Sequence, residues 1–375
     1  MFRKLNKLIL YLIFVCVVLF LSSHLIPRNG QYSDCDNENG AFEIHYIDVG
    51  QADASIVLCD GKAMLIDGGN VEDSDLLYAY LSKLGIDHFD YVVGTHAHED
   101  HIGGLAGALN YASVDVAYCP VVSYDTKAFG NFVKALDKYG ISITVPSRGD
   151  KFTLGSAECT IWAVNTDSSD PNNSSIVLRI VYGETSFVFA ADAEREVEQS
   201  IINWCDDLRS TVLKVGHHGS DTSTSYVWLR EIMPQFAVIS VGKDNSHGHP
   251  TEDVLSRLRD AEVTTFRTDL QGDIICASDG NTVTFTVERN LNVDVFGEIG
   301  DNSLEQIKTL ETDSIEPGEE ENSGQNYVVN KNTKKFHYPH CSSVKDIKES
   351  NRWDYHGTRQ ELIDMDYVPC KQCIP

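Results

Sequence analysis

The segment THAHEDHIGG at residues 95–104 constrains this chain more than any other feature of its sequence. It follows the apolar run YVVG, which has the character of a buried strand, and it precedes a helical pattern. A turn at the end of a strand can direct several side chains toward one point. His96 and His98 are therefore expected to hold one cation. Asp100 and His101 are expected to hold a second cation beside it, since imidazole and carboxylate groups suit zinc and manganese.

Three further segments place carboxylate or imidazole groups at the ends of strand-like runs. Asp192 follows the apolar run FVFAA, a position where an isolated aspartate more often caps a helix. His217 and His218 follow the run LKVG, and His247 and His249 follow the run FAVISVG. Side chains at several strand ends can reach one pocket, so these residues are expected to complete the same metal site.

These motifs resemble the metallo-β-lactamase superfamily and, within it, the metallohydrolase domain of ComEC-type competence proteins. The motifs that carry the resemblance are, in chain order, VGQAD at 49–53, LIDGG at 65–69, THAHEDHIGG, NNSSIVLRI at 172–180, FAADAE, LKVGHHGS and N-x-x-GHP. The resemblance covers about residues 42–290. Two positions depart from the family pattern: Ala52 stands where the family usually has Gly, and His247 stands where Tyr is common.

The resemblance implies an α/β fold for residues 41–295, the αββα sandwich of the metallo-β-lactamases. It implies two divalent metal ions, Zn²⁺ or Mn²⁺, with Asp192 as the carboxylate that bridges them. Many superfamily members have a further histidine ligand in the region where this chain has none, from residue 102 to residue 216. Asn172 or Asn173 is the candidate replacement, and an oxygen ligand there would favour Mn²⁺.

The expected function is that of an exported phosphodiesterase or nuclease that cleaves DNA through a hydroxide shared by the two metal ions. Four residues form the predicted catalytic group: Asp100, His217, His218 and His249. One of the three histidines is expected to protonate the leaving oxygen, and the others complete the metal coordination. His249 and His217 are expected as ligands ahead of His218, and His247 is a possible further ligand.

Two alternatives to a nuclease stay open. The first is a hydrolase of a cell-envelope phosphoester of the phosphocholine or teichoic-acid type. It is favoured by the formal net charge of −26, because an acidic surface repels polyanionic DNA outside the metal cleft. The second is a non-catalytic binding module of a DNA-uptake assembly. The nearly complete set of expected metal ligands argues against it.

Residues 327–375 are predicted to form a separate small zinc module. The candidate ligands of its structural Zn²⁺ are His337, Cys341, Cys370 and Cys373. This segment resembles the zinc-binding module of the Ada-type DNA-repair protein, with His337 where that module has a cysteine. His340 competes with His337 as the ligand, and a disulfide between Cys370 and Cys373 is the alternative to a metal site.

The two remaining segments concern location and flexibility. Residues 1–30 read as a signal peptide or membrane anchor, because three basic residues precede the 14-residue apolar run Leu8–Leu21. A polar spacer at 31–40 follows. The basic residues before the apolar run predict that the hydrolase domain lies outside the cell or on the outer face of the membrane. Residues 296–326 hold nine acidic residues and one lysine and are predicted to be a flexible linker. No protein partner is indicated.

Overall fold

The computed structural model describes residues 42–297 and most of residues 325–370, apart from 340, 358–360, 363–364 and 366. The predicted anchor at 1–30, the spacer at 31–40 and nearly all of the predicted linker therefore lie outside the described residues. Across the part of the chain that is described, no helix combines the length and the apolar character needed to cross a bilayer.

The first sheet has the strand order β15-β14-β1-β2-β3-β4-β5-β6. Its strands are β1 (Phe42–Tyr46), β2 (Ala54–Cys59), β3 (Lys62–Gly68), β4 (His88–Val93), β5 (Ser113–Tyr118), β6 (Ile143–Thr144), β14 (Ile274–Ser278) and β15 (Val283–Val287). Strands β3 to β6 run parallel to one another. The carboxyl ends of β3 and β4 therefore lie at the same edge, where the LIDGG motif ends β3 and the THAHEDHIGG motif follows β4.

The second sheet has the order β13-β12-β11-β10-β9-β8-β7. Its strands are β7 (Lys151–Leu154), β8 (Ala157–Ala163), β9 (Val177–Tyr182), β10 (Thr185–Phe189), β11 (Val212–Lys214), β12 (Phe236–Ile239) and β13 (Thr264–Arg267). Strands β10 to β13 are parallel. Asp192, the His217–His218 pair and the loop with His247 and His249 follow β10, β11 and β12, so they too emerge at one edge.

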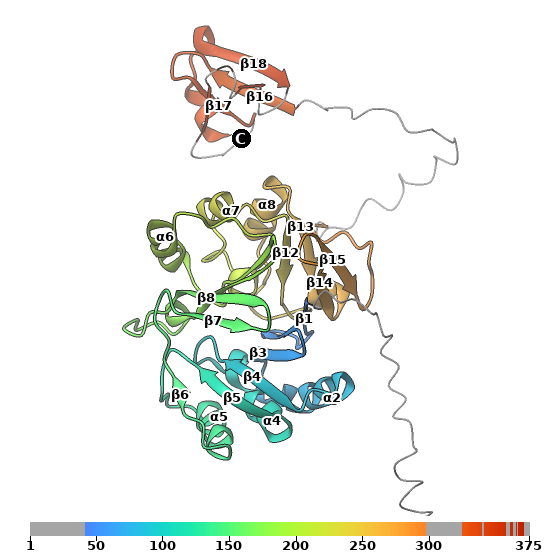
Figure 1. Cartoon of the computed structure of the whole chain (residues 1–375). Helices are drawn as coiled ribbons and strands as arrows, with labels where there is room; N and C mark the ends of the chain where they lie inside the picture. Colours follow the sequence, from blue (N-terminus) through green and yellow to red (C-terminus); the bar gives the residue numbers. More distant parts are fainter. Residues whose placement is uncertain are drawn as a thin grey trace, which may run out of the picture. The chain divides into compact units, whose positions relative to one another are not determined.

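Helices cover the outer face of each sheet (Figure 1). Helices α2 (Ser74–Leu84), α4 (Leu105–Tyr111) and α5 (Lys127–Asp137) pack on the first sheet. Helices α6 (Arg195–Trp204), α7 (Tyr226–Ile232) and α8 (Glu252–Asp260) pack on the second sheet. A third apolar core lies between the two sheets and includes Tyr46, Ile161 and Phe187. The predicted αββα sandwich is confirmed.

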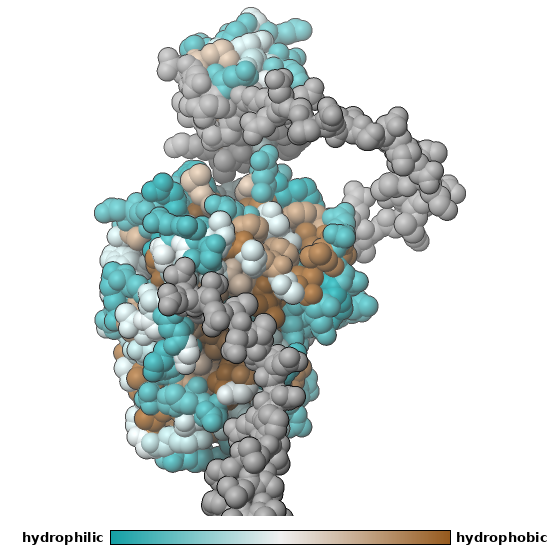
Figure 2. Space-filling view, turned by 45° about the vertical axis from the view of Figure 1, so that its right-hand side comes forward, coloured by the Kyte–Doolittle hydropathy of each residue, from teal (hydrophilic) through white to brown (hydrophobic). Residues whose placement is uncertain are grey.

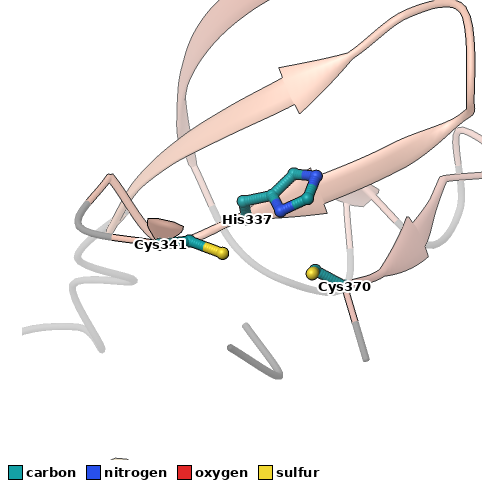
Figure 3. Close-up of side chains that lie close together, drawn as sticks. All are labelled: His337, Cys341 and Cys370. Carbon is teal, nitrogen blue, oxygen red and sulfur yellow. The ribbon is translucent and has the colours of Figure 1, made fainter. Parts of the chain in front are cut away.

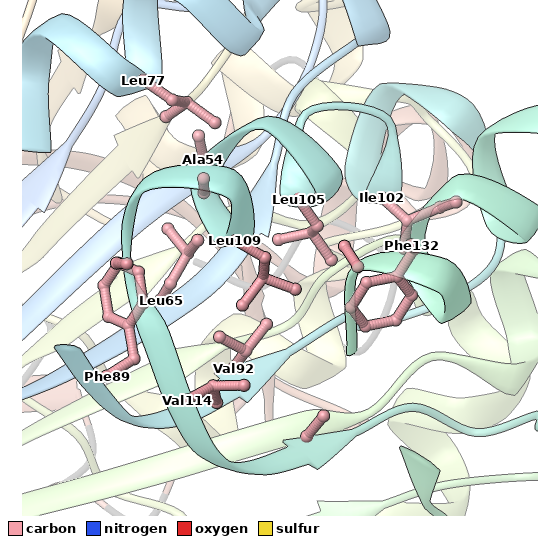
Figure 4. Packing of buried hydrophobic residues seen from close by; sticks show 14 of the residues in the cluster. Ala54, Leu65, Leu77, Phe89, Val92, Ile102, Leu105, Leu109, Val114 and Phe132 are labelled. Carbon is pink, nitrogen blue, oxygen red and sulfur yellow. The ribbon is translucent and has the colours of Figure 1, made fainter. Parts of the chain in front are cut away.

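The core beneath α2, α4 and α5 shows why these segments are helical. Apolar side chains recur along one face of each helix, and Leu77, Leu105 and Phe132 meet Leu65 and other residues of the sheet (Figure 4). Each fully buried side chain of this size contributes roughly 1.5–3 kcal/mol to the free energy of folding.

The surface of the molecule is more polar than this core. On the face in Figure 2, the hydrophobic residues gather toward the centre between hydrophilic margins.

Short elements complete the domain. They are α3 (Glu99–Ile102), α9 (Thr268–Gln271), and the 3₁₀ turns η1 (Val71–Asp73), η2 (Asn172–Ser174) and η3 (Gly216–Gly219). Three of them, α3, η2 and η3, contain predicted metal ligands. The glycine pair of the THAHEDHIGG segment has a steric reason, because a Cβ atom on Gly104 would collide with the carbonyl oxygen of Gly68. Glycine thus allows the metal-binding segment to pack directly on the end of β3.

The C-terminal residues form a small sheet of their own, with the order β18-β16-β17-β19. Its elements are β16 (Gln325–Asn330), β17 (Lys335–His337), η4 (Ser342–Asp346), η5 (Glu349–Asn351), β18 (Arg352–Gly357) and β19 (Val368–Pro369). Tyr327, Val329, Phe336 and Leu362 form a compact apolar cluster on this sheet. So small a core supplies little stability by itself, which is consistent with the predicted metal site.

Candidate metal centre

The first motif folds into a tight turn at the end of β4. His98 is the residue before helix α3, and its carbonyl oxygen accepts hydrogen bonds from the backbone N–H groups of His101 and Ile102 at 3.2 and 3.1 Å. This one-turn helix separates the motif into two pairs of side chains. His96 and His98 precede the helix, whereas Asp100 and His101 lie within it.

His96 and His217 face one oxygen atom of Asp192, and His98 lies beside His96. We call these four residues the first ligand group. The Nε2 atom of His96 lies 3.8 Å from Asp192 Oδ2, and the Nε2 atom of His217 lies 3.5 Å from the same oxygen. The Nδ1 atom of His98 lies 3.0 Å from His96 Nε2. Three imidazoles and one carboxylate oxygen form a donor set suited to a divalent ion.

The other oxygen atom of Asp192 faces Asp100, His101 and His218, and these four residues form the second ligand group. The Nε2 atoms of His101 and His218 lie 3.3 and 3.9 Å from Asp192 Oδ1. Asp100 Oδ2 lies 3.3 Å from His218 Nε2 and 3.9 Å from His101 Nε2. Asp192 therefore stands between two ligand groups, in the position that the sequence analysis gave to the bridging carboxylate.

Unpartnered atoms in the second ligand group show that these residues fit a metal ion. His101 Nε2, His218 Nε2 and Asp192 Oδ1 are all buried, and none of them makes a hydrogen bond to another described residue. A buried polar atom without a partner costs roughly 1–3 kcal/mol, so several of them facing one another need a compensating interaction. A cation that all of them coordinate would supply it.

The charges of the centre reinforce this assignment. Burial raises the pKa of Asp192, but the adjacent imidazoles of His101 and His218 outweigh it and hold this pKa well below its usual range. Burial disfavours the charged form of His218, yet Asp192, Asp53 and Asp100 raise its pKa to about 10. Protons and metal ions thus compete for the same nitrogen atoms, and metal binding is expected to release protons.

Four residues around the candidate metal centre adopt uncommon backbone conformations. His217 and His218 have φ values of 50° and 52°, and Asp67 and Ala191 have φ values of 58° and 49°. Such left-handed conformations in non-glycine residues cost about 1–3 kcal/mol each and are concentrated at functional sites. Two consecutive residues of this kind direct His217 toward Asp192 Oδ2 and His218 toward Asp192 Oδ1.

The position of His218 differs from the order expected from the sequence, which ranked His249 above it as a ligand. His249 lies beside His217, with 5.7 Å between the ring centroids, and belongs to neither ligand group as described. Its Nδ1 atom is buried without a hydrogen-bond partner. Burial, followed by the neighbouring His217 charge, lowers the pKa of His249 to about 4, so its imidazole is neutral at pH 7. A neutral imidazole can coordinate a metal ion or accept a proton. It is less suited to donating a proton, which is the role that the sequence analysis also allowed.

The two asparagine candidates have different surroundings. Asn173 is committed to the protein, because its Oδ1 atom accepts the backbone N–H of Glu194 at 3.1 Å and its Nδ2 atom donates to Glu194 Oε2 at 3.4 Å. Asn172 lines the cleft beside His98 and Asp192, and its Oδ1 atom is buried without a partner. Asn172 is therefore the better candidate for an oxygen ligand.

A polar cleft of about 500 Å³ opens over the two ligand groups. His98, Asp100, Asp192 and His217 lie at its base, and its other lining residues are Gln51, Asn70, Glu99, Asn172, Asn245, Ser246 and His247. His247 is exposed, and its ring stacks on that of His249 at 5.6 Å between centroids. No Lys or Arg is found among the described lining residues, which carry amide, imidazole, carboxylate and hydroxyl groups.

Asp67 contacts a candidate ligand, and the sequence analysis did not single it out. Its Oδ2 atom accepts hydrogen bonds from His101 Nδ1 at 2.8 Å and from the Thr95 hydroxyl at 2.7 Å, and its Oδ1 atom accepts from the Thr95 backbone at 2.8 Å. A carboxylate on the far nitrogen of a metal-binding histidine fixes the ring and directs Nε2 to the metal. The LIDGG motif that contains Asp67 was the available signal.

The C-terminal sheet holds the candidate zinc site. His337, Cys341 and Cys370 are buried, and their possible ligand atoms lie within 4.8 Å of one another (Figure 3). The Nδ1 atom of His337 has no hydrogen-bond partner in the described part, and burial, together with Lys335, lowers the pKa of His337. A neutral imidazole and two thiols fit Zn²⁺. Cys373 and the competing His340 lie outside the described residues.

Comparison with known sequences agrees with the fold. The sequence profile of the Metallo-beta-lactamase superfamily matches residues 47–243, which include every member of both ligand groups. The chain belongs to the metallo-β-lactamase superfamily, whose members include many metal-dependent hydrolases.

Within this superfamily, the chain is similar to proteins named for competence and recombination. It is 29% identical over 304 residues to ComE operon protein 3 of Bacillus subtilis, an alignment that covers 76% of this chain and 38% of that protein. It is 28% identical over 240 residues to Competence protein ComA of Neisseria gonorrhoeae, covering 60% and 30%. It is also 28% identical over 240 residues to Recombination protein 2 of Haemophilus influenzae, covering 62% and 28%. The chain thus spans well under half the length of these relatives.

Proposed function

We propose that this chain is a metal-dependent phosphodiesterase that cleaves DNA. The observation that carries the proposal is the position of Asp192, whose two carboxylate oxygens face two separate ligand groups. Two divalent ions bound there would lower the pKa of a water molecule and neutralise the charge of a phosphoryl group. DNA is proposed as the substrate because the relatives are named as competence and recombination proteins.

The residues of the chain have distinct tasks in this proposal. His96, His98 and His217 would hold one ion, and Asp100, His101 and His218 would hold the other. Asp192 would contribute one carboxylate oxygen to each group. Asn172 presents an oxygen atom to the cleft from the turn η2. His249, which is neutral at pH 7, lies beside His217 and can accept a proton or complete the coordination.

The proposal also includes the location and the C-terminal module. We propose that residues 1–30 direct the chain to the outer face of the membrane or beyond it, as the basic residues before the apolar run predict. We propose that His337, Cys341, Cys370 and Cys373 hold one structural Zn²⁺. That ion would supply stability that the small apolar core of the C-terminal module does not provide by itself.

A second candidate substrate is a cell-envelope phosphoester. The specific observation in its favour is the absence of Lys and Arg among the described residues that line the cleft. Proteins that bind long nucleic acids normally neutralise several phosphates with cationic side chains. A substrate with one diester group would need only the two metal ions.

The test is hydrolysis by the purified full chain in detergent, loaded with Mn²⁺ or Zn²⁺. The substrates are single-stranded DNA, plasmid DNA and bis-p-nitrophenyl phosphate. The variant Asp100→Ala removes a member of the second ligand group, and His88→Ala, which changes an exposed histidine on β4, is the matched control. We expect DNA cleavage by the wild type and by His88→Ala and none by Asp100→Ala. Cleavage of the small diester alone would support the envelope substrate, and no turnover with two metal ions bound would contradict an enzyme.

A further inference from the structure

A buried ion pair lies directly behind the second ligand group. The Nζ atom of Lys214 is 2.9 Å from each carboxylate oxygen of Asp53, and the exposed fractions of the two side chains are 2% and 7%. Lys214 is the last residue of β11, and Asp53 immediately precedes β2. The pair therefore joins the two sheets at the edge where the ligand loops begin.

Asp53 contacts two of the four members of the second ligand group. Its backbone N–H donates to the carbonyl oxygen of Asp100 at 3.0 Å. Its Oδ1 atom lies 3.5 Å from His218 Nδ1, a nitrogen that is also 3.0 Å from the carbonyl oxygen of Ser240. One residue thus restrains both the backbone of Asp100 and the ring of His218.

Stability alone does not account for this pair. Removing an ammonium group and a carboxylate from water costs several kcal/mol per ion, and apolar residues of similar volume often replace such a pair without loss. A buried pair that touches two metal-ligand loops instead resembles the outer groups that orient ligands in metal sites.

Lys214 has a second effect, because of where its ammonium group lies. Asp53, Asp67 and His101 have ligand atoms within 4.8 Å of one another and could themselves hold a cation. The ammonium group already contacts both carboxylate oxygens of Asp53. Lys214 thereby occupies the position that a metal ion bound by Asp53 would need, which we call the inner position. Metal ions are left to the position beside Asp100, which we call the outer position.

We propose that Lys214 and Asp53 are positioning residues for the second ligand group, which they orient toward the outer position while keeping metal ions from the inner one. This inference rests on the proposed two-ion centre, but it concerns metal binding and is independent of the substrate. Replacing a residue that orients a ligand typically lowers metal affinity about 10- to 100-fold. The same loss is expected here for the second ion only.

The test measures Mn²⁺ binding to the metal-free full chain by titration calorimetry, since the thiol-rich C-terminal site disfavours Mn²⁺. The wild type is expected to bind two ions. In Lys214→Met the affinity for the second ion is expected to fall about 10- to 100-fold while the first is retained. Arg267→Met is the matched control, because it removes the ion pair of Arg267 with Asp269, which lies outside both ligand groups.

A double variant, Asp53→Asn with Lys214→Met, separates positioning from folding. It leaves no unpaired buried charge, so its unfolding temperature is expected to return toward that of the wild type while its second-ion affinity stays low. The visible spectrum of the Co²⁺-loaded protein should change in both variants and not in Arg267→Met. Unchanged affinity for both ions in the double variant would overturn the inference. A wild type that binds fewer than two ions would instead contradict the proposed function.

Discussion

The Oδ1 atom of Asp192 lies 3.3 Å from His101 Nε2, and both atoms are buried without a hydrogen-bond partner among the described residues. The second oxygen of the same carboxylate faces His96 and His217 at 3.8 and 3.5 Å. One carboxylate therefore faces two sets of ligands, and each set combines residues that follow β4 of the first sheet with a histidine that follows β11 of the second.

The ring of His101 depends on Asp67, so Asp67→Asn is expected to weaken binding at the second ligand group. Asparagine can no longer supply a charged acceptor for His101 Nδ1, which lies 2.8 Å from Asp67 Oδ2. The loss is expected to be about 10- to 100-fold in affinity for one of two ions. Metal titration of the metal-free chain measures it, and an equal loss at both ions would argue against a specific effect on His101.

Asn172 and Asn173 are neighbours in the sequence but are expected to respond differently to alanine. Asn173→Ala removes two contacts with Glu194 and should lower the free energy of unfolding by about 1–3 kcal/mol. Asn172→Ala removes an unpartnered oxygen at the cleft and should alter metal affinity with little change in stability. Denaturant unfolding of the metal-free protein and Mn²⁺ titration distinguish the two. The assignment fails if Asn173→Ala alone changes metal affinity.

The sequence predicted the parts of this centre that depend on local spacing. His96, His98, Asp100 and His101 lie within six residues, so one turn was enough to bring them together. Asp53 and Asp67 were not predicted as functional residues, because each is a single carboxylate that only the sheet topology brings beside a ligand. The sequence ranked His249 ahead of His218 as a ligand, whereas the left-handed backbone at residues 217 and 218 directs His218 toward Asp192.

The fold was predicted to a similar extent, and for a similar reason. The apolar periodicity of the sequence predicts helices at 75–84, near 126–139 and at 251–260, and α2, α5 and α8 lie there. The sequence pattern predicts no strand at β7, which has four residues of which only Leu154 is fully buried. An edge strand of this kind is defined by its pairing with β8, which a local pattern of apolar residues does not reveal.

Glu198 gives a prediction for pH that is independent of the metal centre. Its Oε1 and Oε2 atoms accept the backbone N–H groups of Thr224 and Ser225, and burial raises its pKa above the usual value. The folded protein thus binds this proton more tightly than the unfolded chain does. Stability should therefore fall as the pH rises from the ordinary glutamate pKa through the raised one.

The variant Glu198→Gln removes this titration. With metal ions chelated, the unfolding free energy of the wild type should fall relative to that of Glu198→Gln as the pH is raised from 4 to 8. Denaturant unfolding at several pH values measures the difference. A difference that is constant over this range would show that Glu198 does not titrate as described.

The C-terminal module is expected to depend on its zinc ion. His337→Ala removes a buried ligand candidate and should lower the zinc content of the full chain by one ion per molecule. Limited proteolysis should then cleave within residues 325–370 while the main domain stays intact. Lys335→Ala changes an exposed neighbour and serves as the control. Full zinc content in His337→Ala would leave His340 or another residue as the ligand.

Two metal ions joined by Asp192 should be visible in the electron paramagnetic resonance spectrum of the Mn²⁺-loaded full chain. At saturation, the wild type is expected to give the spectrum of two magnetically coupled Mn²⁺ ions. The coupling should be lost in Asp192→Ala and retained in the control His88→Ala, which changes an exposed histidine. A wild-type spectrum that shows only isolated Mn²⁺ ions at full loading would contradict a two-ion centre joined by Asp192.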